Sequence, residues 1–194
     1  GSVTGVQTCA LPIFHTPNAW VHIADDNAIT LISARAEMGQ GVYTSMPMLL
    51  AEELNVDLRK VRVAFAPPGK AYGNALIFGL QLTGGSTSVR EGWERQRLAG
   101  AQVREMLIAA AAERWKVDAA QLRAEDGQVL GPNGRRASYG ELAAEAAKLG
   151  AAQPLSRLQW LGGLLSDAVT SGKYQLKKWP QTEREYPKHF RIAT

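Results

Sequence analysis

The chain has 194 residues, a length that suits one domain or part of a larger one. Its 45% hydrophobic and 21% charged residues are typical of a protein with a packed core. Residues 1–150 carry as many acidic as basic side chains, so the net charge of +4 comes from residues 151–194. A neutral body argues against a nucleic-acid-binding surface. The longest strictly apolar run, Met106 to Ala112, is too short to span a membrane.

The first thirteen residues do not have the pattern of a folded segment. Val3 to Ile13 matches the translation of a common short-read sequencing adapter, and it lacks the basic and apolar stretches of an export signal. We therefore interpret residues 1–13 as non-native and expect the fold to begin at Phe14. Because the only cysteine, Cys9, lies in this run, cysteine content does not indicate a redox compartment. The sequence does not assign a cellular location.

Three strands are expected in the first half of the chain. Trp20–Ala24 and Ile29–Ser33 are rich in β-branched residues, and the turn signal Asp25–Asn27 between them predicts a hairpin. Val61–Phe65 alternates like a half-buried strand. Residues 69–82 form a glycine-studded loop with many apolar side chains, which we expect to be buried or to line a pocket.

Two helices are predicted around the middle of the sequence. Apolar residues recur at helical spacing up to Leu54. Because Pro47 is tolerated only in a first turn, we expect this helix to begin near Thr44, which would be its N-cap. A long helix is expected from about Ser86 to Trp115.

The long helix contains Gly92 and Gly100, which we interpret as marks of close packing. On the preceding helix, Glu52 and Glu53 are interpreted as a solvated face rather than a catalytic pair. Short strands joined by turns are expected over residues 122–137. The next four residues, 138–141, have capping-box spacing and should open an alanine-rich helix to about residue 149.

This alternation predicts an α/β (α+β) fold with a mixed sheet, one long helix and a shorter pair of helices. We assign it to residues 14–150. The composition changes after Gly150, and residues 151–194 are interpreted as a divergent or foreign tail without an assigned structure.

Two glycine-rich runs carry the chemical signal: Gly39–Gly41 and Thr83–Ser88. Each is followed by a predicted helix. Glycine lets the backbone approach a ligand closely, and a helix N-terminus offers unpaired N–H groups to an anion. Two such runs in one segment suggest a large cofactor that bears phosphate or oxo groups. Since one cofactor would touch both, we expect them at one end of the fold.

The order and spacing of these runs and their neighbours resemble the molybdenum hydroxylase family, the xanthine dehydrogenase and aldehyde oxidoreductase group. The closer resemblance is to the beta subunit of isoquinoline 1-oxidoreductase-like enzymes. The matching runs are Glu37–Thr44, Pro47–Leu49, Ala51–Leu54 and Gln81–Arg90. The resemblance covers roughly residues 18–149 and implies that residues 14–150 are part of a molybdopterin-binding domain.

The resemblance also implies a cofactor, molybdenum bound to molybdopterin cytosine dinucleotide. The residues that it places at the cofactor are Gly39, Gln40, Gly41, Thr44, Gly84, Gly85, Ser86 and Ser88. Of these, the Gln40 amide has donors and an acceptor for a pterin edge or a metal-oxo group. The implied enzyme is an oxidoreductase that hydroxylates an N-heterocycle or an aldehyde with water-derived oxygen and passes electrons to a small [2Fe–2S] subunit.

The family's catalytic glutamate lies in a distant motif that has no counterpart here, so we expect no catalytic residue and no complete active site in this chain. We also expect no protein-ligated metal, because no His/Cys/Asp cluster has metal spacing. The alternative is a small non-enzymatic α/β module that binds a nucleotide or phosphate or has a structural role. A glycine-rich loop before a helix N-terminus is equally consistent with this alternative.

Overall fold

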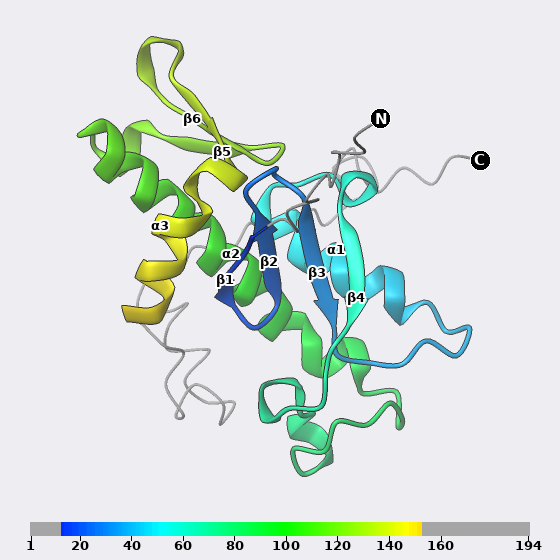
Figure 1. Cartoon of the computed structure of the whole chain (residues 1–194). Helices are drawn as coiled ribbons and strands as arrows, with labels where there is room; N and C mark the ends of the chain where they lie inside the picture. Colours follow the sequence, from blue (N-terminus) through cyan, green and yellow to red (C-terminus); the bar gives the residue numbers. More distant parts are fainter. Residues whose placement is uncertain (1–12, 153–194) are drawn as a thin grey trace, which may run out of the picture.

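The computed structural model describes residues 13–152, and Figure 1 shows their arrangement. The sequence predictions for residues 1–12 and 153–194 lie outside the described residues. Four strands form a mixed sheet in the order β1-β2-β3-β4, with bounds Phe14–Asn18, Val21–Ala24, Ile29–Ser33 and Arg62–Phe65. The first three strands pair antiparallel, whereas β4 pairs parallel with β3.

The helices are α1 (Val42–Leu54), α2 (Ser88–Trp115) and α3 (Tyr139–Ala152). Three short strands, β5 (Arg123–Glu125), β6 (Gln128–Leu130) and β7 (Arg136–Ser138), form a second, antiparallel sheet. The predicted fold class is therefore confirmed, with α2 as the long helix and α1 and α3 as the shorter pair. None of the helices within residues 13–152 is long and apolar enough to cross a membrane.

The core lies between the four-stranded sheet and the helices. Val21, Ile23 and Leu31 are completely buried in the sheet. In Figure 1, α1 and α2 lie behind the sheet, and α3 contacts β1 and β2. The helices thus bury apolar side chains that alternation along the strands places on one face.

The predicted hairpin is confirmed, since β2 and β3 pair across the turn at Asp25–Asn27. The strand β1 was not predicted. It contains Pro17, which a strand at the edge of a sheet can accept. The pairing extends to Ile13, whose carbonyl accepts a hydrogen bond from the Asp25 N–H at 3.3 Å. The capping box of α3 is also confirmed, because the Glu141 carboxylate accepts from the Ser138 N–H at 2.7 Å.

Helix α1 begins two residues earlier than predicted, at Val42, and its N-cap is Gly41 instead of Thr44. Gly41 has φ +80°, a conformation that favours glycine, and its carbonyl accepts from the Ser45 N–H at 2.9 Å. Pro47 consequently lies in the second turn, where it is buried. Local pattern alone did not reveal this start, because the cap comes from the loop before the helix.

Close packing between α1 and α2 is confirmed at both predicted glycines. A Cβ on Gly92 would lie 2.6 Å from the Met46 Cε, and one on Gly100 would lie 2.5 Å from the Leu50 carbonyl oxygen. The backbones of the two helices can approach this closely only because these positions have no side chain. The close packing of α1 against α2 therefore fixes the position of the α2 N-terminus relative to the sheet.

The interpretation of Glu53 as solvated is wrong. Its side chain is fully buried between α1 and α2, where Oε1 accepts from the Arg97 Nε at 2.8 Å. Arg104 Nη1 donates to the Glu53 carbonyl at 2.6 Å. A charge is buried here because its ionic partners come from another helix, which the pattern of α1 alone does not show.

The contact at Gly100 yields a stability prediction. In Gly100→Ala, the new methyl group meets a backbone carbonyl that can move only if α1 shifts. We expect this clash to outweigh the improved helix propensity and to lower the free energy of unfolding by about 1–2 kcal/mol. Thermal unfolding checks the result, with Ala109→Ser on the exposed face of α2 as the control. Equal or higher stability of Gly100→Ala would contradict the close-packing account.

Candidate functional site

The two glycine-rich loops leave the same edge of the sheet. Because β3 and β4 run parallel and pair Ser33 with Phe65, their carboxyl ends lie side by side. The loops that follow, residues 34–41 and 66–87, therefore start together, and in Figure 1 the first extends to the right from the lower end of β3 while the second forms the bottom of the molecule. The Ala36 N–H donates to the Thr83 Oγ1 at 2.8 Å and joins them directly. The expectation that the two motifs share one end of the fold is confirmed.

The first loop is organised by Glu37, which the sequence did not single out. Its Oε1 accepts from the N–H groups of Gly39 at 2.7 Å and Gly41 at 3.0 Å, and Oε2 accepts from the Tyr43 N–H at 2.9 Å. These bonds, that from Tyr43 foremost, hold the pKa of the Glu37 carboxyl below its ordinary value. The backbone donors that suggested an anion site here are thus taken by the chain's own carboxylate.

Gln40 folds back over the same loop. Its Oε1 accepts from the Met38 N–H at 2.6 Å, and its Nε2 donates to the Ala36 carbonyl at 2.9 Å. A primary amide has two N–H groups and two acceptor lone pairs, so one of each stays available. The residue is exposed, as are Gly39, Gly41 and Thr44. Gln40 can therefore contact a ligand at the surface of the loop while it shapes the loop.

The second loop leads into α2 with an open helix end. Gly85 and Ser86 are successive left-handed residues, with φ +61° and +52°. Thr87 is the N-cap, but its hydroxyl donates to the Gly84 carbonyl at 2.8 Å and caps no N–H of the helix. The first N–H groups of α2, from Ser88 onward, therefore remain unpaired within the helix. The positive end of the dipole of this 28-residue helix lies at the same place, although the Ser88 side chain itself is buried.

The apolar loop between the two motifs, residues 69–82, is more exposed than the sequence predicted. Tyr72 and Asn74 are buried, but four large apolar side chains lie on the surface, and Phe78 is 97% exposed: Leu76, Phe78, Leu80 and Leu82. The prediction is therefore wrong in so far as it expected these side chains to be buried. Backbone N–H and C=O groups of this loop bond to one another in two 3₁₀ turns and in a bridge between Asn74 and Leu80. In this conformation the apolar side chains lie on the outside of the loop.

Metal ligation by the protein itself has no support in the described part of the chain. No group of three His, Cys, Asp or Glu residues within 13–152 could hold an ion. His15 pairs instead with Asp25 at 2.7 Å. His22 lies on β2, where burial lowers its pKa.

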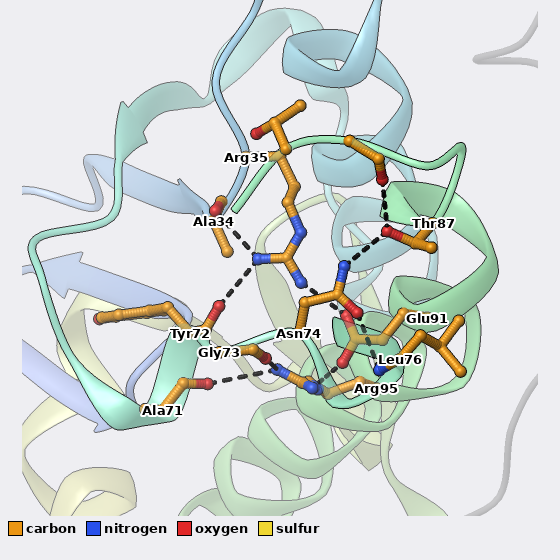
Figure 2. Close-up of polar contacts among 12 residues, drawn as sticks. Ala34, Arg35, Ala71, Tyr72, Gly73, Asn74, Leu76, Thr87, Glu91 and Arg95 are labelled. Carbon is orange, nitrogen blue, oxygen red and sulfur yellow. Dashed lines mark hydrogen bonds and ion pairs between the residues drawn. The ribbon is translucent and has the colours of Figure 1, made fainter. Parts of the chain in front are cut away.

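A buried polar cluster underlies both loops, and Figure 2 shows its contacts. Its charged members are Arg35, Glu91 and Arg95, which the sequence analysis did not identify. The sequence offered one signal for this cluster, a charged residue (Arg35) two positions after an apolar strand. Nothing in the sequence showed which acid, 56 residues further on, would pair with Arg35.

Residues 1–190 match the family described as the molybdopterin cofactor-binding domain. The chain therefore belongs to that family.

Among curated proteins, the chain is 42% identical over 131 residues to isoquinoline 1-oxidoreductase subunit beta of Brevundimonas diminuta, covering 66% of this chain and 17% of that protein. It is 37% identical over 92 residues to the membrane-bound aldehyde dehydrogenase (pyrroloquinoline-quinone) of Gluconacetobacter polyoxogenes, covering 47% of this chain and 11% of that protein. Among solved structures, CO dehydrogenase from Oligotropha carboxidovorans has a TM-score of 0.49 at 18% identity, over 63% of this chain and 15% of that chain. The chain thus spans less than a fifth of the length of these relatives.

The Glu37 bonds generate a pH prediction. Because the folded pKa is lowered, the contribution of Glu37 to loop order is complete above the ordinary glutamate pKa and is lost as the pH falls through the lowered value. We expect the amide resonances of Gly39, Gly41 and Tyr43 to titrate together below the ordinary glutamate pKa. Two-dimensional amide NMR measures this midpoint. In Glu37→Gln the common titration should vanish, and a midpoint at or above the ordinary value would contradict the capping role.

Proposed function

We propose that this chain is part of the molybdenum-cofactor-binding subunit of an oxidoreductase that hydroxylates an N-heterocycle or an aldehyde with oxygen derived from water. Membership in the molybdopterin cofactor-binding domain family supports the cofactor class. The single observation that carries the site is the uncapped N-terminus of α2, preceded by Gly85 and Ser86 in left-handed conformations.

The residues present fit such a cofactor. An anionic, phosphate-bearing group suits an open helix N-terminus with small neighbours, because N–H groups and the helix dipole both favour negative charge. Two sets of residues would hold the cofactor: Gly84, Gly85, Ser86 and Ser88 at its anionic portion, and Gly39, Gln40, Gly41 and Thr44 along its pterin. When bound, the molybdenum centre supplies the two-electron redox chemistry of the reaction.

The chain's own residues have a binding and orienting role in this proposal. Gln40 offers its remaining N–H and lone pair to the pterin edge, while its other contacts keep the amide in place. Glu37 orders the loop, because its carboxylate accepts from three backbone N–H groups of the loop and the helix start. The proton-accepting carboxylate belongs to a part of the parent subunit outside this chain.

The finer features of the enzyme are also part of the proposal: the cytosine dinucleotide form of the cofactor and a small [2Fe–2S] subunit that receives the electrons. Similarity to a protein named as a beta subunit supports a multi-subunit enzyme. The four exposed apolar residues beside the site need a cover. In this proposal the rest of the parent subunit provides it, and the isolated chain neither retains molybdenum nor turns over substrate.

A substitution at Gln40 tests the proposed function in the intact subunit. Loss of one or two hydrogen bonds at a buried, charged cofactor costs about 1–3 kcal/mol each, so Gln40→Ala should reduce turnover, molybdenum content or both by about 5-fold or more. Gln121→Ala, an exposed glutamine in the 3₁₀ turn after α2, is the matched control.

Turnover and molybdenum content are measured side by side for wild type and both variants. If Gln40→Ala matches the control in both, Gln40 is only a turn residue. If the wild-type subunit carries a nucleotide or phosphate but no molybdenum and no pterin, the chain is a phosphate-binding module of another kind and the proposed function is wrong.

A further inference from the structure

Arg35 occupies the point where the sheet, the apolar loop and α2 meet. It lies two residues beyond the end of β3, and its side chain is completely buried. Figure 2 shows its guanidinium between the loop and the helix: Nη1 donates to the Tyr72 carbonyl at 2.8 Å, and Nη2 donates to the Glu91 carboxylate at 2.8 Å. One side chain thus ties the start of the first motif loop to the first turn of α2.

Glu91 receives a second cation from its own helix. Arg95, one turn further on, forms an ion pair with the other carboxylate oxygen of Glu91. Arg95 Nη1 also donates to the Gly73 carbonyl at 2.7 Å. The two arginines therefore bind neighbouring carbonyls of the same loop, and Glu91 keeps the two guanidinium groups in register (Figure 2).

The cluster reaches the second motif loop through Asn74. Its Nδ2 donates to the Thr87 Oγ1 at 2.7 Å, and the Thr87 hydroxyl donates to the Gly84 carbonyl at 2.8 Å. On the other side, the residue after Arg35 is Ala36, whose N–H binds Thr83. The buried charges are thus linked to both motif loops through the backbone at Gly73–Asn74 and at Arg35–Ala36, followed by hydrogen bonds to Thr87 and Thr83.

The charges of this cluster are not balanced. Two guanidinium groups share one carboxylate, so a net positive charge lies beneath the N-terminus of α2. Burial, and then the charge of Arg35, lower the pKa of Arg95 to about 10, which still leaves it protonated at neutral pH. A buried cation adds to the helix dipole and favours an anion at the loop above it.

Buried ion pairs add little net stability compared with apolar packing of the same shape, whereas these three side chains fix the geometry of the segments that they join. We propose that Arg35, Glu91 and Arg95 are positioning residues that hold the loops 36–41 and 83–88 in one arrangement and so preorganise the cofactor site. This inference rests on the proposed function for its purpose, but the coupling of the two loops is a property of the chain itself.

The test compares two buried carboxylates. Glu91→Gln keeps the shape of the side chain and removes its charge. Glu53→Gln is the matched control, because the Glu53 side chain is also shielded from solvent (0% exposed, against 5% for Glu91) and also pairs with two arginines, but it joins α1 to α2. Amide hydrogen exchange of the chain is followed at Ala36, whose N–H joins the two loops, and at Thr87, whose N–H donates to the Gly84 carbonyl within the second loop.

We expect Glu91→Gln to speed exchange at both amides by at least tenfold while amides in the middle of α2 keep their protection. Glu53→Gln should lower the melting temperature and leave the two loop amides unchanged. Unchanged loop exchange in Glu91→Gln, or equal loosening in both variants, would overturn the positioning role. Arg35→Lys is the milder second variant and decides the question in the same way if Glu91→Gln does not fold.

The intact subunit supplies a readout that a purely structural role would not move. Glu91→Gln should lower kcat and molybdenum content by at least tenfold with KM changed less than twofold, since the network acts on the cofactor and not on the substrate. Glu53→Gln, assayed well below its melting temperature, should change neither. A wild-type subunit without molybdenum would reject the proposed function and leave the exchange result intact, so the two failures are distinguishable.

Discussion

The parallel pairing of β3 with β4 is the constraint on which the candidate site depends. Parallel strands end at the same edge of a sheet, so the two loops that follow them begin side by side although their glycine motifs are more than forty residues apart. Ligands of open α/β sheets bind at this type of edge. Arg35 then connects that edge to α2, and the close contact at Gly100 fixes α2 against α1. The position of the loops is therefore set by the packing beneath them.

The two motif loops differ in what they leave free. In the first, the N–H groups of Gly39 and Gly41 are bound to the chain's own Glu37, and the Gln40 amide keeps a donor and an acceptor available. The second ends in an uncapped helix, since the hydroxyl of Thr87 is directed to a carbonyl. In the proposed function the second loop therefore binds the anionic part of the cofactor, and the first contacts the pterin. Two similar glycine motifs thus have different electrostatic roles.

Local signals in the sequence were enough for the elements whose formation is local. The hairpin at Asp25–Asn27, the capping box and the span of α2 were predicted, because turn residues and periodicity act within a few positions. Motif order was enough to indicate the family. The prediction for Glu53 failed because its partners are distant, since arginines of another helix bury it. The prediction for Phe78 failed for a different reason, because its loop bonds to itself and leaves the side chain exposed. The Arg35 cluster was missed for the same reason as Glu53.

The most direct test of the account is an experimental structure of the intact subunit purified with its cofactor. The account predicts that the N–H groups of Gly85, Ser86 or Ser88 lie within about 3 Å of an oxygen of the bound cofactor, with the Gln40 amide on the same molecule. The Arg35–Glu91 contact should be present beneath them. A cofactor bound away from both loops would contradict the account, and so would an α2 N-terminus capped by protein.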